Sequence, residues 1–535
     1  MTDDIDGIAA AATSLELMDW PTLIQRWDWA VGAAPDQTFL ELTSIGADAV
    51  SWSYSQFDEI VEQVRGSLTA VHGLRAGDRI QLVLSNCPAF VAVLLAAARS
   101  GWMILPCDPR STSDEMARQA ARVEPAVAIC GLDQSDAYYA SGATTPVVTV
   151  DPTDSEMTTL RTHGGGGAHP EVVSSHTVLG LMFTSGTTSE PKIVEVTQAN
   201  YAFAGDVMAA AAGLRPGSRF LVVLPLFHAN AQYYSIAASI SVGATVILVG
   251  GFSASRFLEQ AEQTRATHAS LFAAPIRMIL ARARPTNLPQ PLENVWFSQN
   301  LTNDEYERFA TLVGCRPRQI YGMTETAPAV LMSRRLNRSQ STLGTPTLGC
   351  HVRLRNPHSD TPVKPGDTGR IQVGGYRGLS LFSAYRDNPQ ATAEAFVDHD
   401  EAGLTWMDTG DLGRVNACGE VEFVGRSGDM LKVGGENVSV LEVEAFLLEH
   451  PHVVDAAVVG VPDPVRDEVP LAFVVPAADA PNNVAEAVMA WCATRLSGPR
   501  RPREIRIVDQ LPRTAVGKIQ RFRLIDRPGS PTKPV

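Results

Sequence analysis

The sequence predicts an α/β fold in three parts: a large N-terminal domain of parallel-sheet βαβ subdomains, a β-rich subdomain and a small α+β C-terminal domain. Two stretches in the first half of the chain alternate short β-rich runs with helical patterns, which is typical of βαβ units. From about 345 to 424 the chain is instead rich in proline, glycine and short strands. The tail that follows segment 425–429 has about a hundred residues, a usual size for a separate domain.

The first alternating region contains three expected strands, at residues 78–85, 101–106 and 126–130. An apolar run at 89–98 lies between the first two of them. Its ten residues are too few to span a bilayer, so we expect a buried helix there.

The second alternating region has expected buried strands at 219–225, 244–250 and 294–298. Residues 369–375 are expected to form a strand of the β-rich subdomain. In the tail we expect strands in DAAVVGV and LAFVV. No repeat with a period of about 20–50 residues is visible, which argues against a solenoid.

Composition restricts the class of protein. The 535 residues are too many for one core, and 45% hydrophobic with 19% charged residues suits a globular chain. A net charge of −14 argues against nucleic acid or an anionic membrane as the main partner, and the short apolar run at 89–98 argues against membrane insertion. The leading segment is acidic, unlike a signal peptide. The seven scattered cysteines form no CxxC pair, so we expect a reducing cytoplasm rather than a disulfide framework or structural zinc.

Lysine is rare, and its positions are informative. The chain has five lysines, and arginine carries the rest of its positive charge. Three of the five lie in short glycine-bearing segments: Lys192 in SGTTSEPK, Lys432 in GRSGDMLKVGG and Lys518 in LPRTAVGK. A compact ammonium does not replace a planar guanidinium, so these places are interpreted as needing a mobile point charge. The alternative explanation is a GC-rich coding bias, with these lysines retained by chance.

The segment LMFTSGTTSEPKIVEVT (181–197) predicts a strand, a loop of small polar residues and a second strand. Such a loop offers backbone N–H groups and hydroxyls that suit polyphosphate oxygens, and Lys192 adds a cation. It is not a Walker A loop, because Pro191 and Ile193 stand where that motif needs glycine and Ser/Thr. An ordinary polar hairpin loop is an equally good explanation of this segment alone.

Two further segments carry side chains suited to a nucleotide. In QIYGMTETAP (319–328), Tyr321 can stack on a base, Thr324 can bond to a phosphate and Glu325 is an oxygen ligand for Mg²⁺. In WMDTGDLGRV (406–415), Asp411 is expected just after a strand, where its carboxylate can accept hydrogen bonds from both ribose hydroxyls. Each segment alone is also compatible with a plain turn.

Four segments occur in order: SGTTSEPK, YGMTET, DTGDLG with GRSGDMLKVGGENVS, and LPRTAVGKIQR. With them the chain resembles the adenylate-forming superfamily of acyl-CoA synthetases, peptide-synthetase adenylation domains and firefly luciferase, from about Trp29 to about Leu524. It is most similar to carnitine/crotonobetaine-type CoA ligases in SGTTS with its serine at 189, in YGMTETAP, and in the stretch from GGENVSVLEVE through VPDPVRDEVPLAFVV. Phe227, His228 and Ala229 stand near the place where peptide-synthetase domains carry an aspartate for the amino group, which argues against an amino-acid substrate.

The resemblance implies a set of ATP-binding residues. Tyr321 would stack on adenine, Thr324 would touch the α-phosphate and Glu325 would bind Mg²⁺. The residues that would hold the β- and γ-phosphates are Thr184, Ser185, Gly186, Thr187, Thr188 and Lys192.

The resemblance also implies how the ribose and the reacting groups are held. Asp411 and Arg426 would bind the ribose. Lys518 would bridge the substrate carboxylate and the α-phosphate, because a preorganised cation offsets the repulsion between two anions.

The implied reaction has two steps. The carboxylate attacks the α-phosphate and expels pyrophosphate, and a mobile C-terminal domain then rotates so that coenzyme A attacks the acyl-adenylate. The implied divisions are an N-terminal AMP-binding domain at 1–424, a hinge at 425–429 and the mobile domain at 430–535. Gly428 in the hinge permits the backbone change at low cost.

Four residues would serve the thioester step by the same resemblance. Lys432, Gly434 and Gly435 would line the pantetheine tunnel, and His228 would lie near its inner mouth. A packed core histidine is the alternative for His228, since one histidine beside apolar residues is weak support for a role.

The phosphate loop departs from the usual pattern of relatives. Ser189 and Ile193 replace glycines, Gln198 stands where a histidine is common, and Glu190 adds a negative charge beside the expected triphosphate. These changes affect the ATP half-reaction more than the recognition of AMP or acyl-adenylate.

Several functions are compatible with the motifs. The leading prediction is a carboxylate–CoA ligase that releases AMP and pyrophosphate. An enzyme that only converts a preformed acyl-adenylate into a thioester, an acyl transferase onto a carrier protein, and a non-catalytic acyl-nucleotide binder are the alternatives. The acid is expected to be apolar and to bind among residues 227–234, 298–301 and 323–330. A homodimer is compatible with this assignment.

Overall fold

The structure is a computed structural model that describes residues 20–43, 49–161, 173–184, 191–282, 290–333, 342–357, 359–400, 403–426, 430–433, 436–463, 466–496, 498–513 and 519–525. The chain divides into two compact units. Unit 1 comprises residues 1–186, 190–352 and 373–407, and unit 2 comprises 187–189, 353–372 and 408–535. Each unit is described by itself.

A run of mostly parallel strands forms one sheet of unit 1. Its parallel members follow the order β13-β12-β11-β9-β10-β1, and antiparallel partners lie at either end, β14 with β15 and β2. The strands are β1 (Thr38–Thr43), β2 (Val50–Ser53), β9 (Arg219–Val222), β10 (Thr245–Val249), β11 (His268–Phe272), β12 (Asn294–Ser298), β13 (Arg318–Tyr321), β14 (Leu331–Met332) and β15 (Thr342–Pro346).

A second sheet of unit 1 has the order β18-β8-β7-β4-β3-β5-β6. Strands β7, β4, β3, β5 and β6 are parallel, whereas β8 and β18 are antiparallel to their neighbours. The strands are β3 (Arg79–Val83), β4 (Met103–Pro106), β5 (Val127–Gly131), β6 (Val147–Val150), β7 (Val178–Phe183), β8 (Ile193–Thr197) and β18 (Ala384–Tyr385). The alternation that predicted parallel βαβ units is therefore confirmed.

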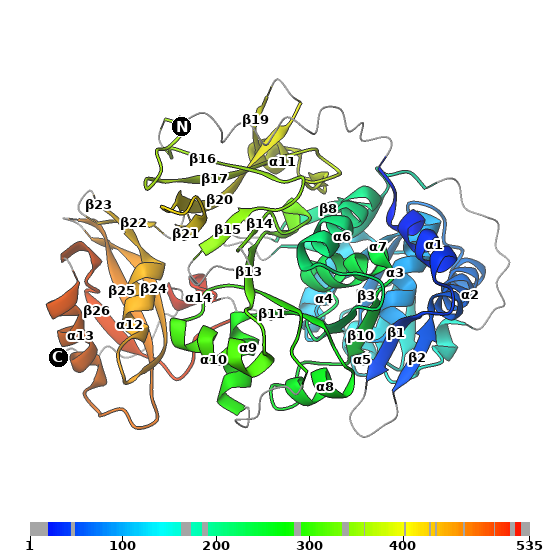
Figure 1. Cartoon of the computed structure of the whole chain (residues 1–535), viewed down its shortest axis with the longest axis horizontal. Helices are drawn as coiled ribbons and strands as arrows, with labels where there is room; N and C mark the ends of the chain where they lie inside the picture. Colours follow the sequence, from blue (N-terminus) through cyan, green and yellow to red (C-terminus); the bar gives the residue numbers. More distant parts are fainter. Residues whose placement is uncertain are drawn as a thin grey trace. The chain divides into compact units, whose positions relative to one another are not determined.

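Helices connect and cover these sheets (Figure 1). The expected buried helix at 89–98 is α3, in which those ten residues are at most 2% exposed. The helical elements of unit 1 within the described ranges are α1 (Leu23–Ala33), α2 (Tyr54–His72), α3 (Pro88–Ser100), α4 (Ser113–Val123), α5 (Leu132–Ala140), η3 (Thr158–Leu160), α6 (Gln198–Ala212), η4 (Asn230–Ala237), α7 (Ala238–Val242), α8 (Phe257–Gln263), α9 (Ala273–Arg282), α10 (Asn303–Val313), η5 (Thr324–Thr326) and α11 (Pro389–Ala395).

Local sequence signals set where several helices begin and end. A threonine or serine stands before each of α1, α2, α4, α6 and α10, and a Gln, Glu or Asn three residues later completes a capping box. The two side chains satisfy backbone N–H groups that the first turn leaves without intrahelical partners. Glycines with positive φ end α2, α3, α6 and α10, because glycine adopts the left-handed conformation without a Cβ clash.

The capping box of α10 gives a stability prediction. Thr302 Oγ1 accepts from the Glu305 N–H at 3.2 Å. Thr302→Ala should lower the free energy of unfolding by about 0.5–2 kcal/mol. Thr311→Ala on the same helix should be neutral or slightly stabilising, since exposed Thr311 bonds only back to Glu307 O and alanine is the better helix former. Urea titrations followed by tryptophan fluorescence compare the two, and equal transition midpoints would contradict the prediction.

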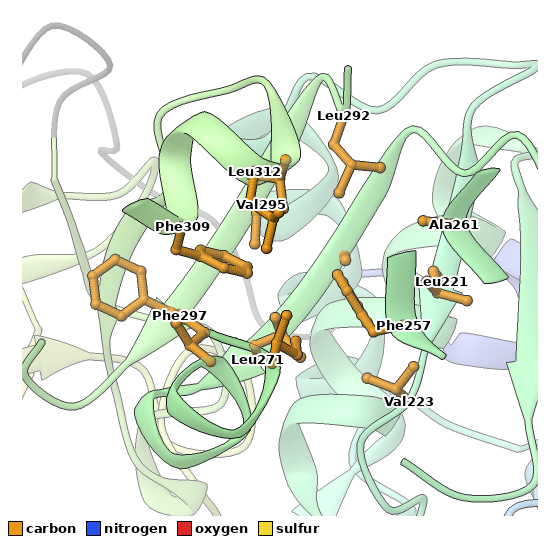
Figure 2. Close-up of a cluster of buried hydrophobic side chains, with 14 of the residues drawn as sticks. Leu221, Val223, Phe257, Ala261, Leu271, Leu292, Val295, Phe297, Phe309 and Leu312 are labelled. Carbon is orange, nitrogen blue, oxygen red and sulfur yellow. The ribbon is translucent and has the colours of Figure 1, made fainter. Parts of the chain in front are cut away.

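A hydrophobic cluster fills the space between strands β9, β11 and β12 and helices α8 and α10. Figure 2 shows Leu221, Leu271 and Phe297 from the strands gathered with Phe257 and Phe309 from the helices. All five side chains are 0% exposed. This packing fixes the ends of the strands, from which the loops of the candidate site emerge.

Unit 2 has its own core. A long antiparallel hairpin pairs β24 with β25. Strands β22 and β26 both pair with the other edge of β25, and β23 pairs with β22. Valines such as Val443, Val458, Val474 and Val488 form its hydrophobic cluster. The elements that lie wholly in unit 2 are β21 (Val421–Arg426), β22 (Met430–Val433), β23 (Glu436–Ser439), α12 (Val440–Leu448), β24 (Val453–Asp463), β25 (Asp467–Pro476), α13 (Val484–Arg495), η7 (Gly498–Arg500), β26 (Glu504–Ile507) and α14 (Phe522–Ile525). The unit boundary crosses β16 (His351–Arg355), β17 (Thr368–Gly375) and β20 (Thr405–Val415), and β19 (Phe396–His399) belongs to unit 1.

Each unit contains segments that are distant from one another in sequence. Residues 353–372 group with the C-terminal part, and the boundary near 407 passes through β20. Residues 427–429 of the expected hinge lie outside the described residues, so the boundaries at 424 and 430 remain predictions. Among the helices that the structure describes, none combines the length and apolarity needed to cross a bilayer.

Candidate active site

The expected phosphate loop connects two antiparallel strands. Phe183 at the end of β7 pairs with Ile193 at the start of β8, and the Thr184 N–H donates to Lys192 O at 3.0 Å. The strand–loop–strand prediction is thus confirmed at both ends, although Ser185, Gly186, Thr187 and Thr188 lie outside the described residues. The exposed side chain of Lys192 places its ammonium over the ring of Tyr385, with Nζ 4.5 Å from the centroid.

Ile193, which the motif assigns to the phosphate loop, lies elsewhere in the structure. It belongs to β8 rather than to the loop, is 2% exposed and packs in a hydrophobic cluster with Val83 and Leu181. An aliphatic side chain therefore contributes core packing where a glycine would leave a gap. Of the departures considered in the sequence, Ser189 and Glu190 belong to the loop itself, and both lie outside the described residues.

The YGMTET segment forms a tight turn after β13. Val330 N–H donates to Tyr321 O at 2.8 Å, and Met323 N–H donates to Thr326 Oγ1 at 3.0 Å. A Cβ at Gly322 would lie only 3.0 Å from Tyr234 Oη and 3.0 Å from Ala329 Cα, so a side chain at this position would require these neighbours to shift by a few tenths of an ångström. Ala327 has φ +53°, a costly conformation for a residue with a side chain.

This turn presents Thr324 and Glu325 from η5. Thr324 and Tyr321 are half-buried, whereas Glu325 is 4% exposed. The hydroxyl of Tyr385 donates to Glu325 Oε1 at 2.9 Å, and the Phe382 N–H donates to Glu325 O at 2.8 Å. The expected metal ligand is consequently held by both its side chain and its backbone.

Tyr385 joins two of the predicted site residues. Its hydroxyl contacts Glu325, and its ring faces Lys192. Burial raises the pKa of the Tyr385 hydroxyl, and the adjacent Glu325 carboxylate raises this pKa further, so the tyrosine stays protonated and donates. Sequence reasoning missed Tyr385, which lies 60 residues from Glu325 in a segment without a local motif.

Buried amides hold the loop that carries His228. Asn86 donates to Leu224 O at 3.0 Å and to Val249 O at 3.1 Å, and it accepts from Leu226 N–H at 2.8 Å. Asn86 was not predicted, because its partners are more than 130 residues away. Half-buried His228 lies after β9, with its ring centroid 4.2 Å from that of Phe227.

The helix after this loop is η4, a π-helix whose residues are all buried. Gln232 donates to Leu226 O at 2.7 Å and accepts from Tyr201 Oη at 2.6 Å. Asn230 Oδ1 accepts from Ser270 Oγ at 2.8 Å. The region expected to receive the acid therefore starts with a rigid polar network, and π-helical turns are frequent at functional sites.

In unit 2, the expected ribose-binding pair lies on neighbouring strands. Asp411 of β20 is in register with Arg426 of β21, and Arg426 Nε lies 3.1 Å from Asp411 Oδ1. Asp411 was expected just after a strand, and this was wrong: it lies inside β20. The strand continues because Gly410 adopts φ +71° and a bulge follows between Leu412 and Gly413.

The remaining predicted residues are not all described. The backbone of Lys432 belongs to β22. Gly434, Gly435 and Lys518 lie outside the described residues.

Comparisons with known proteins identify the family. The family model "AMP-binding enzyme" matches residues 27–386, and the model "AMP-binding enzyme C-terminal domain" matches residues 442–518. The crotonobetaine/carnitine–CoA ligase of Escherichia coli O139:H28 (strain E24377A / ETEC) is 30% identical, covering 95% of this chain and 100% of that protein. The ligase of the same name from Proteus mirabilis (strain HI4320) is also 30% identical, covering 93% and 97%.

Solved structures share the fold. ATP-bound MatB from Rhodopseudomonas palustris has a TM-score of 0.83 at 23% identity, covering 94% of this chain and 98% of that chain. The o-succinylbenzoate CoA synthetase MenE from Bacillus subtilis, in complex with OSB-AMP, has a TM-score of 0.82 at 22% identity, covering 95% and 99%.

Fold and motifs together define an adenylate-forming enzyme. The chain belongs to the AMP-binding enzyme family and is an acid–thiol ligase of the acyl-CoA synthetase type.

Proposed function

We propose that this enzyme activates an apolar carboxylic acid with ATP and transfers the acyl group to coenzyme A. The products are an acyl-CoA thioester, AMP and pyrophosphate. In the first step a carboxylate oxygen bonds to the α-phosphorus and the bond to pyrophosphate breaks. In the second, the CoA sulfur bonds to the acyl carbon, AMP leaves and the thiol proton passes to solvent.

One observation carries the proposal: a cation and a buried carboxylate meet at the same tyrosine. Lys192 lies over the ring of Tyr385, and Glu325 accepts from its hydroxyl. A triphosphate needs positive charge from the protein and an oxygen ligand for its metal ion close together. Lys192 supplies the first and Glu325 the second.

The donor set fits Mg²⁺. Mg²⁺ usually takes one or two protein carboxylates and completes its shell with phosphate oxygens and water, and Glu325 offers one buried carboxylate. When bound, the metal would neutralise phosphate charge. The role of this chain is to hold the carboxylate fixed, through the hydroxyl of Tyr385 and the backbone of Phe382.

The remaining site residues are assigned by their motif positions. Tyr321 would contact adenine, Thr324 the α-phosphate, and Asp411 with Arg426 the ribose. Thr184 and the loop through Thr188 would hold the outer phosphates, and Lys518 the reacting carboxylate. Lys432, Gly434, Gly435 and His228 would serve coenzyme A after rotation of the C-terminal domain about 425–429.

A panel of carboxylic acids tests the proposed function. The panel includes crotonobetaine and carnitine, which the names of the similar ligases mention, together with apolar acids. Each acid is assayed for ATP–pyrophosphate exchange and for CoA thioester formation. One acid should support both reactions, and failure of every acid in exchange would contradict the first step.

The departure at Glu190 favours a second candidate function, in which the enzyme takes a preformed acyl-adenylate and performs only the thioester step. Synthetic acyl-adenylates distinguish the two. Thioester formation from them, with no exchange from any acid, would favour this second function.

Location in the cytoplasm and assembly as a homodimer are also part of the proposal. A reducing cytoplasm is supported by five of the seven cysteines being buried free thiols.

Glu190 gives a prediction about the loop. Glu190→Gly should raise the kcat/KM for ATP in pyrophosphate exchange about 1.4- to fivefold, because a single charge–charge interaction at a protein surface is worth roughly 0.2–1 kcal/mol. Ile193 is kept, since it packs in the core. Glu259→Gly, at an exposed glutamate of α8, is the charge-matched control. An unchanged or lower kcat/KM in Glu190→Gly would show that the charge is harmless.

A further inference from the structure

We infer that Tyr385 is a positioning residue that fixes the Glu325 carboxylate and the Lys192 ammonium in the arrangement required by a metal–triphosphate complex. This rests on the proposed function and goes beyond it, since it assigns a role to a side chain outside the motifs.

The contacts that carry this inference come from three separate segments. Tyr385 stands in β18, Lys192 precedes β8 and Glu325 lies in η5. The hydroxyl donates to Glu325 Oε1 at 2.9 Å, and the ammonium lies 4.5 Å from the ring centroid. One side chain therefore contacts both charged groups, one at its polar end and one at its π-face.

The backbone around Tyr385 is held firmly. Tyr385 is in register with Val194 of β8, its N–H donates to Thr392 Oγ1 at 2.9 Å, and Arg386 N–H donates to Ile193 O at 2.8 Å. Upstream, Asn200 donates to Leu379 O at 2.6 Å and to Leu381 O at 2.9 Å. A ring on such a support has little freedom to move.

Each of the two contacts has a defined effect on the charged group that it restrains. An ionised carboxylate only accepts hydrogen bonds, so the Tyr385 hydroxyl donates to Glu325 Oε1 and fixes the orientation of the carboxylate. The ring face attracts the ammonium by its quadrupole without neutralising its charge. The lysine is thus restrained near the phosphate loop and still able to bind an anion.

The alternative is that Tyr385 only packs. It is 7% exposed and its ring centroid lies 4.7 Å from that of Phe382. Tyr385 also lines a cavity of about 550 Å³ shared with Glu195, Arg386 and Phe396, so a shorter side chain opens space that water can enter. Variants at this position should therefore fold, and binding measurements can separate the two roles.

The experiment measures metal binding directly. Electron paramagnetic resonance of Mn²⁺ is recorded with the full chain and an ATP analogue whose α–β bridge cannot be cleaved. Tyr385→Phe should bind Mn²⁺ about 10–100-fold more weakly than the wild type, as is usual when a residue that orients a metal ligand is lost. Tyr376→Phe, at a half-buried tyrosine of the same segment, is the matched control and should bind normally.

Kinetics separate the two contacts. Tyr385→Phe should raise the Mg²⁺ concentration for half-maximal pyrophosphate exchange with little change in the KM for ATP, because the ring remains. Tyr385→Leu should in addition raise the KM for ATP about two- to thirtyfold. Neither variant should slow thioester formation from a supplied acyl-adenylate.

The outcomes are distinct. Wild-type Mn²⁺ binding by Tyr385→Phe would overturn the inference, as would an equal loss in both half-reactions together with a lower melting temperature. A wild-type chain that binds Mn²⁺ with the analogue but turns over no acid would refute the proposed function, and the comparison of Mn²⁺ affinities would still decide the inference.

Discussion

Replacing Lys518 by alanine is expected to slow adenylation by about 10²–10³-fold, which is the loss typical of removing one preorganised donor at a developing charge. By its GK motif, Lys518 is proposed to bridge the substrate carboxylate and the α-phosphate. Two anions approach there, and without the ammonium their repulsion enters the barrier. ATP–pyrophosphate exchange under saturating acid measures the effect.

The same variant should leave the thioester step intact. In the proposed mechanism Lys518 acts only in the adenylation step. Conversion of a supplied acyl-adenylate to acyl-CoA should therefore proceed within about twofold of the wild-type rate, a change of less than 1.36 kcal/mol in the barrier. Lys364→Ala, at an exposed lysine outside the site, should change neither reaction. Equal losses in both half-reactions would contradict this division of roles.

Glu325→Gln should reduce pyrophosphate exchange by about 10²-fold or more. The substitution keeps the shape of the side chain and its acceptor for the Tyr385 hydroxyl, but removes the charge. Metal stabilisation of phosphate charge is worth several kcal/mol, and each 1.36 kcal/mol is tenfold in rate. Excess Mg²⁺ should restore part of the activity, because the loss is in metal affinity.

A surface substitution controls for this result. Glu259→Gln, on the exposed side of α8, makes the same chemical change away from the site and should leave exchange unaltered. If Glu325→Gln retained exchange within twofold and an unchanged Mg²⁺ requirement, Glu325 would not be the metal ligand.

Features encoded in neighbouring residues were predictable. The apolar run at 89–98 gave the buried helix α3, and the β-rich runs gave parallel strands such as β3, β4 and β5. The loop between β7 and β8 was placed correctly because small polar residues separate two alternating segments. In each case the physical cause, periodicity or a turn composition, acts over a few residues.

Features that depend on distant contacts were not predictable. Asp411 lies inside β20 because Gly410 and a bulge let the strand continue past the DTGD motif. Tyr385 reaches Glu325 only because β18 pairs with β8. Residues 353–372 group with unit 2, which no local pattern indicates. These arrangements arise from pairing between segments far apart in the chain.

Isotope transfer tests the central claim most directly. An acid that is active in the panel is prepared with ¹⁸O in both carboxylate oxygens and converted with ATP and coenzyme A, and the AMP is analysed by mass spectrometry. Attack of the carboxylate on the α-phosphate predicts one ¹⁸O in each AMP and the other in the thioester carbonyl. AMP without ¹⁸O, or ADP as the nucleotide product, would contradict an acyl-adenylate intermediate.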